Sequence, residues 1–580
     1  MLLIYHLNYG QKNNNMVNFL VFIIALLSSI VTYWQSGRIL PLIDYAYQVE
    51  NAYRIFIGEV PYRDFFLVLP PGTYAYMALI MKVFGLSNLI QISFLMIFSF
   101  FTVILTFSIL KHINKNRITN IVLLLPLIFA GYAIYPFPSY DMSATLCMLL
   151  GWMLIWNVYE NKNSSPFKYV FIGFTLTLPS FFKQNTGYIY TVSMLMLVLY
   201  EIYTSKINVR KKTILFLVGY ILPIVMFILY LLYTQSFKQY IFQTITFPAR
   251  ARNIVASSRV ILLDVFNKRN LILYSSVLLA YIISVRKKLL VKYKEVMMFM
   301  LLAVSTILFP IVYLFQIIRR YVNKEFFFYF EYIAKYYFSI WYLVIGILAF
   351  YIIKRLYSKN LRERKPVFSL IFSVEIIAIC LVSFLSQGVN GSTYGIYPLF
   401  VIILSLILVE TNLYIKGISW SKFIMYISIL MTCVLSIYVF YNVRLQYFSR
   451  TGTYTRASLP GMEHLATRGP WIKEMEDMIE WAKSNCPRSE SVVSIPGEDP
   501  IYFLLRRKPP LPYFQYLSST YPFSGKEYAK TIVSNNIKWV IVKTHTQNVD
   551  WKKTDDLLLY ISQRYALYQR IQGYNIYRRK

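Results

Sequence analysis

Apolar stretches long enough to cross a lipid bilayer recur along the first 445 residues of this 580-residue chain. An α-helix needs about 20 mainly apolar residues to span the hydrocarbon core. We predict thirteen such helices, at residues 16–34, 88–110, 118–136, 142–158, 168–180, 188–204, 213–233, 270–285, 296–317, 337–353, 366–386, 395–412 and 423–442. The first follows a short polar lead, and no small-residue cleavage motif comes after it, so we interpret it as a membrane helix rather than a signal peptide.

The composition agrees with a membrane protein. Hydrophobic residues make up 57% of the chain and charged residues only 15%, whereas soluble domains carry roughly 25% charged residues. The net charge of +33 lies in short clusters between the apolar spans, which favours membrane topology and contact with anionic lipid over nucleic-acid binding. Four cysteines and four scattered histidines indicate neither a disulfide framework nor a histidine-based zinc site.

The connecting loops alternate in character. Short loops rich in Lys and Arg lie near residues 111–117, 162–168, 206–212, 286–294 and 354–365, and the positive-inside rule makes them cytoplasmic. The N-terminus is then cytoplasmic, and an odd number of helices places the C-terminal residues outside the plasma membrane.

Residues 446–580 are predicted to form a small extracytoplasmic α/β domain after the transmembrane domain of residues 1–445. We expect helices at 471–484, 524–536 and 554–564, strands at 491–495 and 537–542, and a hairpin over 566–578 around Gln572 and Gly573. Ser524 followed by Glu527 has the spacing of a capping box.

The first outer loop, residues 35–73, holds the most informative motifs. Asp44 is followed by the run Gly58-Glu-Val-Pro-Tyr-Arg-Asp-Phe-Phe66 and then by Pro70-Pro-Gly72. This order resembles the first extracytoplasmic loop of GT-C-fold glycosyltransferases, the superfamily of protein O-mannosyltransferases and lipid A aminoarabinose transferases, and most closely a large bacterial branch. The resemblance implies a GT-C-like fold, a polyprenyl-phosphate sugar donor, and an acceptor that is a glycan, a glycolipid or a protein.

In that superfamily the acidic residue after the first helix acts on the acceptor, and Asp44 occupies this place. A carboxylate there can take the proton of an attacking hydroxyl while the sugar–phosphate bond breaks. The alternative is that Asp44 caps the helix that follows. The resemblance also places a second acidic residue, here Asp141, in the outer loop before the fourth helix, where the alternative is again an N-cap.

Basic residues are candidates for contact with the donor phosphate. Lys183 lies in a Lys-Gln-Asn-Thr-Gly run similar to one in the same branch, although it could instead be an interfacial anchor. Relatives often carry His or Lys just before the two prolines, where this chain has Leu69, so arginines are candidate replacements: Arg63, Arg250, Arg252, Arg319 and Arg320. Possible substrate contacts are Glu50, Tyr62, Asp64 and Tyr394.

One further residue keeps a second class of function open. Glu375 lies in the eleventh apolar span, so it should face the bundle interior, either as a structural residue or as a proton relay in a transporter. A non-catalytic receptor or scaffold is a third class. No cofactor is predicted. The acidic residues form no obvious divalent-metal site, and the sequence leaves metal dependence open.

Overall fold

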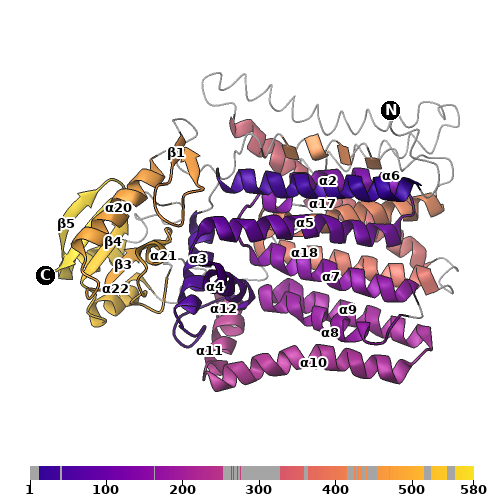
Figure 1. Ribbon diagram of the computed structural model, residues 1–580, viewed down its shortest axis with the longest axis horizontal. Helices are drawn as coiled ribbons and strands as arrows, with labels where there is room; N and C mark the ends of the chain where they lie inside the picture. The colour runs from indigo at the N-terminus through magenta and orange to yellow at the C-terminus, as the bar shows by residue number, and fades with distance from the viewer. Residues whose placement is uncertain are drawn as a thin grey trace.

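A bundle of long helices carries a small α/β domain at one end (Figure 1). The structure is a computed structural model that describes residues 12–38, 42–161, 164–251, 327–357, 364–414, 454–468, 470–514, 524–544 and 555–580, with isolated positions between 263 and 439 and at 546. We refer to the end of the bundle that meets the C-terminal domain as the domain end, and to the opposite end as the far end.

The bundle is built from long apolar helices that run along a common direction in Figure 1. They are α2 (Lys12–Ser36), α5 (Asn88–Ile113), α7 (Tyr140–Glu160), α8 (Lys168–Phe182), α9 (Gln184–Ser205), α10 (Val209–Tyr233), α17 (Phe327–Leu356) and α18 (Arg364–Tyr414).

Six segments in the described part are long and apolar enough to cross a membrane. They are Asn14–Ser36, Asn88–Ile113, Tyr140–Glu160, Val209–Tyr233, Lys365–Ser386 and Thr393–Glu410. Each coincides with a predicted span, and the predicted spans at 168–180, 188–204 and 337–353 lie within α8, α9 and α17. The spans at 270–285 and 296–317 lie almost wholly outside the described residues, and in the span at 423–442 the described positions are scattered and helical. The total of thirteen stays a prediction.

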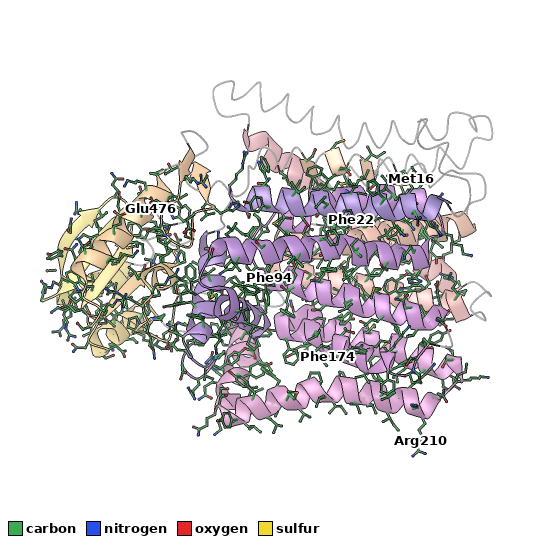
Figure 2. The ribbon with its side chains drawn as sticks, in the orientation of Figure 1. Met16, Phe22, Phe94, Phe174, Arg210 and Glu476 are labelled. Atoms are coloured by element: carbon green, nitrogen blue, oxygen red, sulfur yellow. The ribbon has the colours of Figure 1, made fainter. Side chains whose placement is uncertain are left out.

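The sides of the bundle suit a lipid environment. Phe22 and Phe174 are 48% and 44% exposed and lie along the bundle in Figure 2. A soluble protein would bury most such side chains, whereas lipid solvates them. Figure 2 also places Met16 and Arg210 at the far end and Glu476 in the C-terminal domain.

The predicted helix at 118–136 is wrong as a continuous element. The α-helix α6 (Arg117–Leu124) gives way to the short 3₁₀ turns Leu125–Ile128 and Gly131–Ala133. Pro126 has no N–H to continue the helix, and Gly131 adopts a φ of 59°, in the left-handed region that glycine tolerates best. The break leaves Tyr132 in the second 3₁₀ turn and Tyr135 in irregular backbone close to the start of α7.

The two predicted spans at 366–386 and 395–412 lie within one element, α18, which folds back on itself. The ring of Trp341 in α17 contacts both Phe384 and Phe400, with centroid distances of 5.8 and 4.9 Å. Along a straight helix those two phenylalanines would be separated by about 24 Å. Both halves of α18 therefore pass the same level of the bundle.

Shorter helices form a layer between the bundle and the C-terminal domain (Figure 1). They are α3 (Leu42–Phe56), α4 (Gly72–Phe84), α11 (Phe237–Ile241), the π-helical turn Phe242–Thr246 and α12 (Phe247–Ala251). In α4 the apolar side chains Leu79, Val83 and Phe84 are 61%, 63% and 55% exposed. An amphipathic helix with this apolar face is suited to the membrane interface.

The C-terminal domain has the predicted elements. Its helices include α20 (Trp471–Asn485), α21 (Ile501–Leu505), α22 (Gly525–Ser534) and α23 (Asp555–Arg564). Strands β3 (Val492–Ile495), β4 (Trp539–Lys543), β5 (Tyr565–Ile571) and β6 (Tyr574–Arg579) form a sheet in the order β3-β4-β6-β5, with β3 and β4 parallel and the other pairs antiparallel. The capping box of Ser524 and Glu527 is present.

Hydrogen bonds fix this domain to the first loop of the bundle. The Phe66 amide donates to the Pro512 carbonyl across 2.9 Å, and a small antiparallel pair, β1 (Tyr454–Arg456) and β2 (Ala466–Arg468), sits beside Gly37, whose carbonyl accepts from the Ala466 amide. Loop and domain therefore form one continuous packed end of the molecule.

Candidate active site at the domain end of the bundle

Asp44 is an exposed carboxylate in the first turn of α3. Its Oδ2 accepts a hydrogen bond of 2.9 Å from the hydroxyl of Tyr135. Because α3 begins at Leu42, Asp44 lies inside the helix, and the N-cap alternative is wrong. A carboxylate in the first turn is still favoured by the helix dipole, so Asp44 is held in place while it remains open to solvent.

Tyr135 was missed by sequence reasoning. Its ring stacks on that of Tyr394 in α18, with centroids 4.4 Å apart and planes 16° apart. Tyr135 follows the broken third span, and the break is what brings it over α3. The only signal in the sequence was a tyrosine beside a proline in a short outer loop, a pattern too common to single it out.

Asp141 has a different environment, although it is also in the first turn of its helix. Ser139 is the N-cap of α7, and its Oγ accepts from the Asp141 amide across 3.2 Å. The N-cap alternative for Asp141 is therefore wrong as well. Its side chain is buried, pairs with Lys183 and accepts a 3.1 Å hydrogen bond from the hydroxyl of Tyr394.

Five residues therefore form a connected aspartate–tyrosine array: Asp44, Tyr135, Tyr394, Asp141 and Lys183. The charge of Asp141 is matched by a buried ammonium, while the charge of Asp44 faces solvent. Of the two carboxylates, Asp44 is the one exposed to solvent. An exposed and oriented carboxylate such as Asp44 can act as a general base. The buried Asp141–Lys183 pair holds Tyr394, whose ring stacks on Tyr135.

Two glycines allow this close approach. A Cβ on Gly72, the glycine of the Pro-Pro-Gly motif, would collide with the backbone oxygen of Phe181, two residues before Lys183. A Cβ on Gly395 would lie 2.5 Å from the Cβ of Asp141. In the same contact the Thr145 hydroxyl donates to the Gly395 carbonyl across 2.7 Å. The first loop and α18 can therefore reach the array only because these positions lack side chains.

Lys183 ends α8 and precedes α9, and its side chain is only 4% exposed. An interfacial anchor would extend its ammonium to water, so that alternative is wrong. Its predicted contact with a donor phosphate stays a prediction, and any such phosphate would have to share Lys183 with Asp141.

The candidate arginines lie away from this array. Arg63 is exposed and forms a two-bond pair with Asp64, whose pKa is lowered chiefly by that hydrogen bond. Arg250 is exposed at the end of α12. Arg252, Arg319 and Arg320 lie outside the described residues. The structure brings none of the described arginine candidates into the array.

Glu50 and Tyr62 are internal to the protein rather than presented to a substrate. Glu50 is fully buried and accepts from the Phe503 amide of α21 across 3.0 Å. Desolvation is the main reason that its pKa is raised to about 8. Tyr62 is buried, and its hydroxyl donates to the Leu69 carbonyl. Both stabilise the first loop and its contact with the C-terminal domain.

The first loop, the start of α9 and the π-helical turn meet at the domain end of the bundle. Gln243 in the π-helical turn accepts from the Leu67 amide across 2.7 Å and donates to the Tyr62 carbonyl across 2.9 Å. Gln184 donates to the Thr244 carbonyl. A π turn is often found at functional sites, and here it presents Gln243 to the first loop, a role that sequence reasoning missed.

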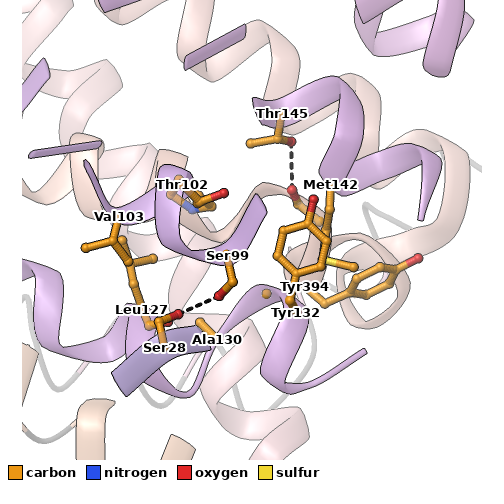
Figure 3. A pocket seen from close by; sticks show the side chains of 13 residues that line it. Ser28, Ser99, Thr102, Val103, Leu127, Ala130, Tyr132, Met142, Thr145 and Tyr394 are labelled. Carbon is orange, nitrogen blue, oxygen red and sulfur yellow. Dashed lines mark hydrogen bonds between the residues drawn. The ribbon is translucent and has the colours of Figure 1, made fainter. Parts of the chain in front are cut away.

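A small cavity lies within the bundle beside Tyr394 (Figure 3). Its volume is about 20 Å³, and Ser28, Ser99 and Thr145 contribute to its lining. That is room for one water molecule and far too little for a sugar. Over the described residues, no three His, Cys, Asp or Glu side chains are grouped so as to hold a metal ion.

These features define a multi-pass helical membrane protein with a tyrosine-linked pair of carboxylates under a C-terminal α/β domain. No protein-family model matches the chain, and no curated protein matches it in sequence. Among solved structures, it is similar to ArnT from Cupriavidus metallidurans bound to undecaprenyl phosphate, with 11% identity, a TM-score of 0.44, and coverage of 96% of this chain and 97% of the other. It is also similar to an Archaeoglobus fulgidus oligosaccharyltransferase tethered to an acceptor peptide, with 10% identity, a TM-score of 0.49, and coverage of 97% and 74%.

Proposed function

We propose that the protein is a glycosyltransferase that moves one monosaccharide from a polyprenyl-phosphate donor to an extracytoplasmic acceptor. The single observation that supports this most is the exposed carboxylate of Asp44, oriented by Tyr135 at the domain end of the bundle. It lies in the same loop as the Pro-Tyr-Arg-Asp-Phe and Pro-Pro-Gly motifs, which the GT-C resemblance rests on.

In the proposed step, an acceptor hydroxyl attacks the anomeric carbon of the donor sugar. A new carbon–oxygen bond forms, the bond from that carbon to the phosphate oxygen breaks, and polyprenyl phosphate leaves. Asp44 takes the hydroxyl proton as the new bond forms. Attack from the face opposite the phosphate inverts the anomeric centre.

The Asp141–Lys183 pair has a positioning role in this proposal. Tyr394 links the pair to Tyr135, and Tyr135 donates to Asp44. Because the pair is buried and hydrogen-bonded, it holds Tyr394 in one orientation. Tyr394 in turn positions Tyr135 and, through it, the base. Preorganised groups of this kind need little rearrangement during reaction.

The orientation we propose has the C-terminal domain outside. Lys111, Lys168 and Arg210 belong to the ends of α5, α8 and α10 that lie opposite that domain. Short basic loops favour the cytoplasmic side. Asp44 then faces the compartment in which lipid-linked sugars, not nucleotide sugars, are the activated donors.

A transporter is the alternative that the buried charges raise. Glu375 is fully buried within the membrane bundle, as predicted for an ionisable residue at that depth. The pairs Lys212–Glu201 and Arg355–Glu410 sit at helix ends, where they stabilise the bundle without forming a path through it. Glu375 alone is weaker support than the array around Asp44.

The test is an in vitro transfer assay with the full chain in lipid nanodiscs and a panel of polyprenyl-phosphate sugars, guided by glycan analysis of a deletion strain. We expect release of polyprenyl phosphate coupled to glycosylation of the acceptor by the wild-type chain and not by Asp44→Asn. If the deletion strain lacks a glycan and expression of the Asp44→Asn variant restores that glycan fully, the proposal is contradicted.

A further inference from the structure

Three consecutive cations follow α21 in the C-terminal domain and extend in three directions. Arg506 has a φ of 56°, a conformation uncommon for a residue with a side chain. Its guanidinium donates to the Leu86 carbonyl across 3.0 Å, Arg507 donates to the carbonyls of Cys486 and Pro487, and Lys508 pairs with Glu59. The turn therefore spreads positive charge around one point on the surface.

Two cavities meet at this point. One has a volume of about 360 Å³ and the other about 410 Å³, and Arg488, Arg506 and Arg507 line both. Lys508 adds to the first and Lys483 to the second. We call the five residues Lys483, Arg488, Arg506, Arg507 and Lys508 the basic cleft.

Acidic side chains balance only part of this charge, since Lys508 pairs with Glu59 and Arg506 faces Glu50. Among the described lining residues, Glu490 is the acid in the first cavity, and it accepts from the indole N–H of Trp539. The lining of the second cavity includes no acid among the described residues. A hollow with this surplus of Lys and Arg attracts anions and repels cations.

Arg506 forms part of the wall of the basic cleft. Its guanidinium carbon lies 4.4 Å from the centre of the Phe503 ring, and its Nη2 donates to the Leu86 carbonyl. These contacts hold the charge of Arg506 in place beside the cleft. Arg488 is exposed, and the fork of its guanidinium matches two oxygens of a phosphate.

The position of the basic cleft limits where that ligand can come from. Leu86, which Arg506 contacts, lies in the turn between α4 and α5. The helix α5 is a candidate membrane span that begins at Asn88, and α4 exposes Leu79, Val83 and Phe84. The basic cleft thus lies next to the level at which the bundle enters the membrane, where lipid phosphates are concentrated.

We propose that the basic cleft binds a phosphate group presented at the membrane surface. The phosphate belongs either to the headgroup of an anionic bilayer lipid or to a soluble or glycan-linked phosphate ester that reaches the same surface. In both cases Arg488 provides bidentate contact, and Lys483 and Arg506 provide attraction at longer range. The proposal does not rest on the sugar transfer proposed above.

The test uses the full chain with Lys483→Gln and Arg488→Gln combined, since both side chains are exposed and their replacement leaves the core intact. The matched control combines Lys530→Gln and Arg570→Gln, which remove the same charge from exposed positions on α22 and β5. Native mass spectrometry measures phosphatidylglycerol bound relative to phosphatidylcholine, and calorimetry measures pyrophosphate binding.

We expect the cleft variant to bind its phosphate probe roughly 25-fold more weakly than the wild type, since each cation near a membrane surface contributes about a fivefold factor and two are removed. The control should bind as the wild type does. Loss of the phosphatidylglycerol preference alone identifies a lipid headgroup, and loss of pyrophosphate binding alone identifies a soluble or glycan-linked phosphate. Equal binding of both probes by wild type, cleft variant and control would overturn the proposal.

Discussion

The hydroxyl of Tyr135 donates a 2.9 Å hydrogen bond to Oδ2 of Asp44. This contact joins the turn before α7 to the first loop and orients a carboxylate that is open to solvent. In the proposed reaction, the base is therefore positioned by a tyrosine that itself stacks on Tyr394.

The first prediction concerns these two residues. Asp44→Asn keeps the side-chain shape but removes its basicity, so transfer should fall at least about a hundredfold, within the usual range for a general base. Tyr135→Phe keeps the ring stack and loses the hydrogen bond, so we expect a smaller fall, mainly in kcat. Initial rates with purified protein in nanodiscs measure both. Asp477→Asn, at a partly exposed position of α20 in the C-terminal domain, is the control. Near-normal turnover in Asp44→Asn would remove Asp44 as the base.

The second prediction concerns the buried Asp141–Lys183 pair. Lys183→Met leaves a buried carboxylate and Asp141→Asn leaves a buried ammonium, so each should cost about 3–5 kcal/mol of stability. The double variant removes both charges and should cost less than the sum. Thermal unfolding in detergent measures all three. The same changes at the exposed pair Lys473–Asp477 should cost about 0.3–0.5 kcal/mol, and additive losses at Asp141 and Lys183 would show that the pair is not coupled.

The third prediction concerns the approach of α18 to Asp141. Gly395→Ala adds a methyl group 2.5 Å from the Cβ of Asp141, which must push α18 away from α7 and shift Tyr394. We expect transfer activity to fall by roughly tenfold or more, because small displacements of positioning residues are costly. Gly346→Ala in α17 meets open space and should change nothing. Equal activity of the two variants would show that this contact does not position the array.

The fourth prediction is a pH dependence at Glu50. Burial raises its pKa from 4.5 to about 8, so the folded chain holds a proton that the unfolded chain releases between those values. Docking of the C-terminal domain on α3 is therefore most stable at low pH and weakens as pH rises from about 4.5 to 8. The groups that face Glu50 are the amides of Tyr502 and Phe503 and the cations Arg54 and Arg506. Glu50→Gln can still accept from the Phe503 amide, and it should flatten the dependence of the unfolding temperature on pH over that interval. An unchanged slope would assign the dependence to other groups.

The fifth prediction is the topology. A cysteine in place of Gln563, exposed on α23, should react with a membrane-impermeant maleimide in intact cells. A cysteine in place of Lys211, exposed near the start of α10, should react only after permeabilisation. The reverse pattern would place Asp44 on the cytoplasmic side and contradict the proposed donor.

Much of the fold was predictable because it depends on local patterns. Apolar length identified α2, α5, α7 and α10, and a cap followed three residues later by glutamate identified the start of α22. The break at Pro126 was missed because hydropathy continues through it while backbone hydrogen bonding does not. The sequence predicted two separate spans in the region of α18, and both lie within the single element from Arg364 to Tyr414.

The candidate site divides in the same way. The sequence by itself determined that the chain crosses a membrane many times, that a loop with Asp44 and Pro-Pro-Gly follows the first helix, and that Asp141 and Lys183 stand alone in their loops. Only the tertiary structure decided that Lys183 belongs to Asp141, that Tyr394, 253 positions further along, binds the same carboxylate, and that Tyr135 orients Asp44. The physical reason is that spans and caps are set by residues within a few turns of one another, whereas these contacts depend on how separate helices pack, which glycines at 72 and 395 permit and no local pattern records.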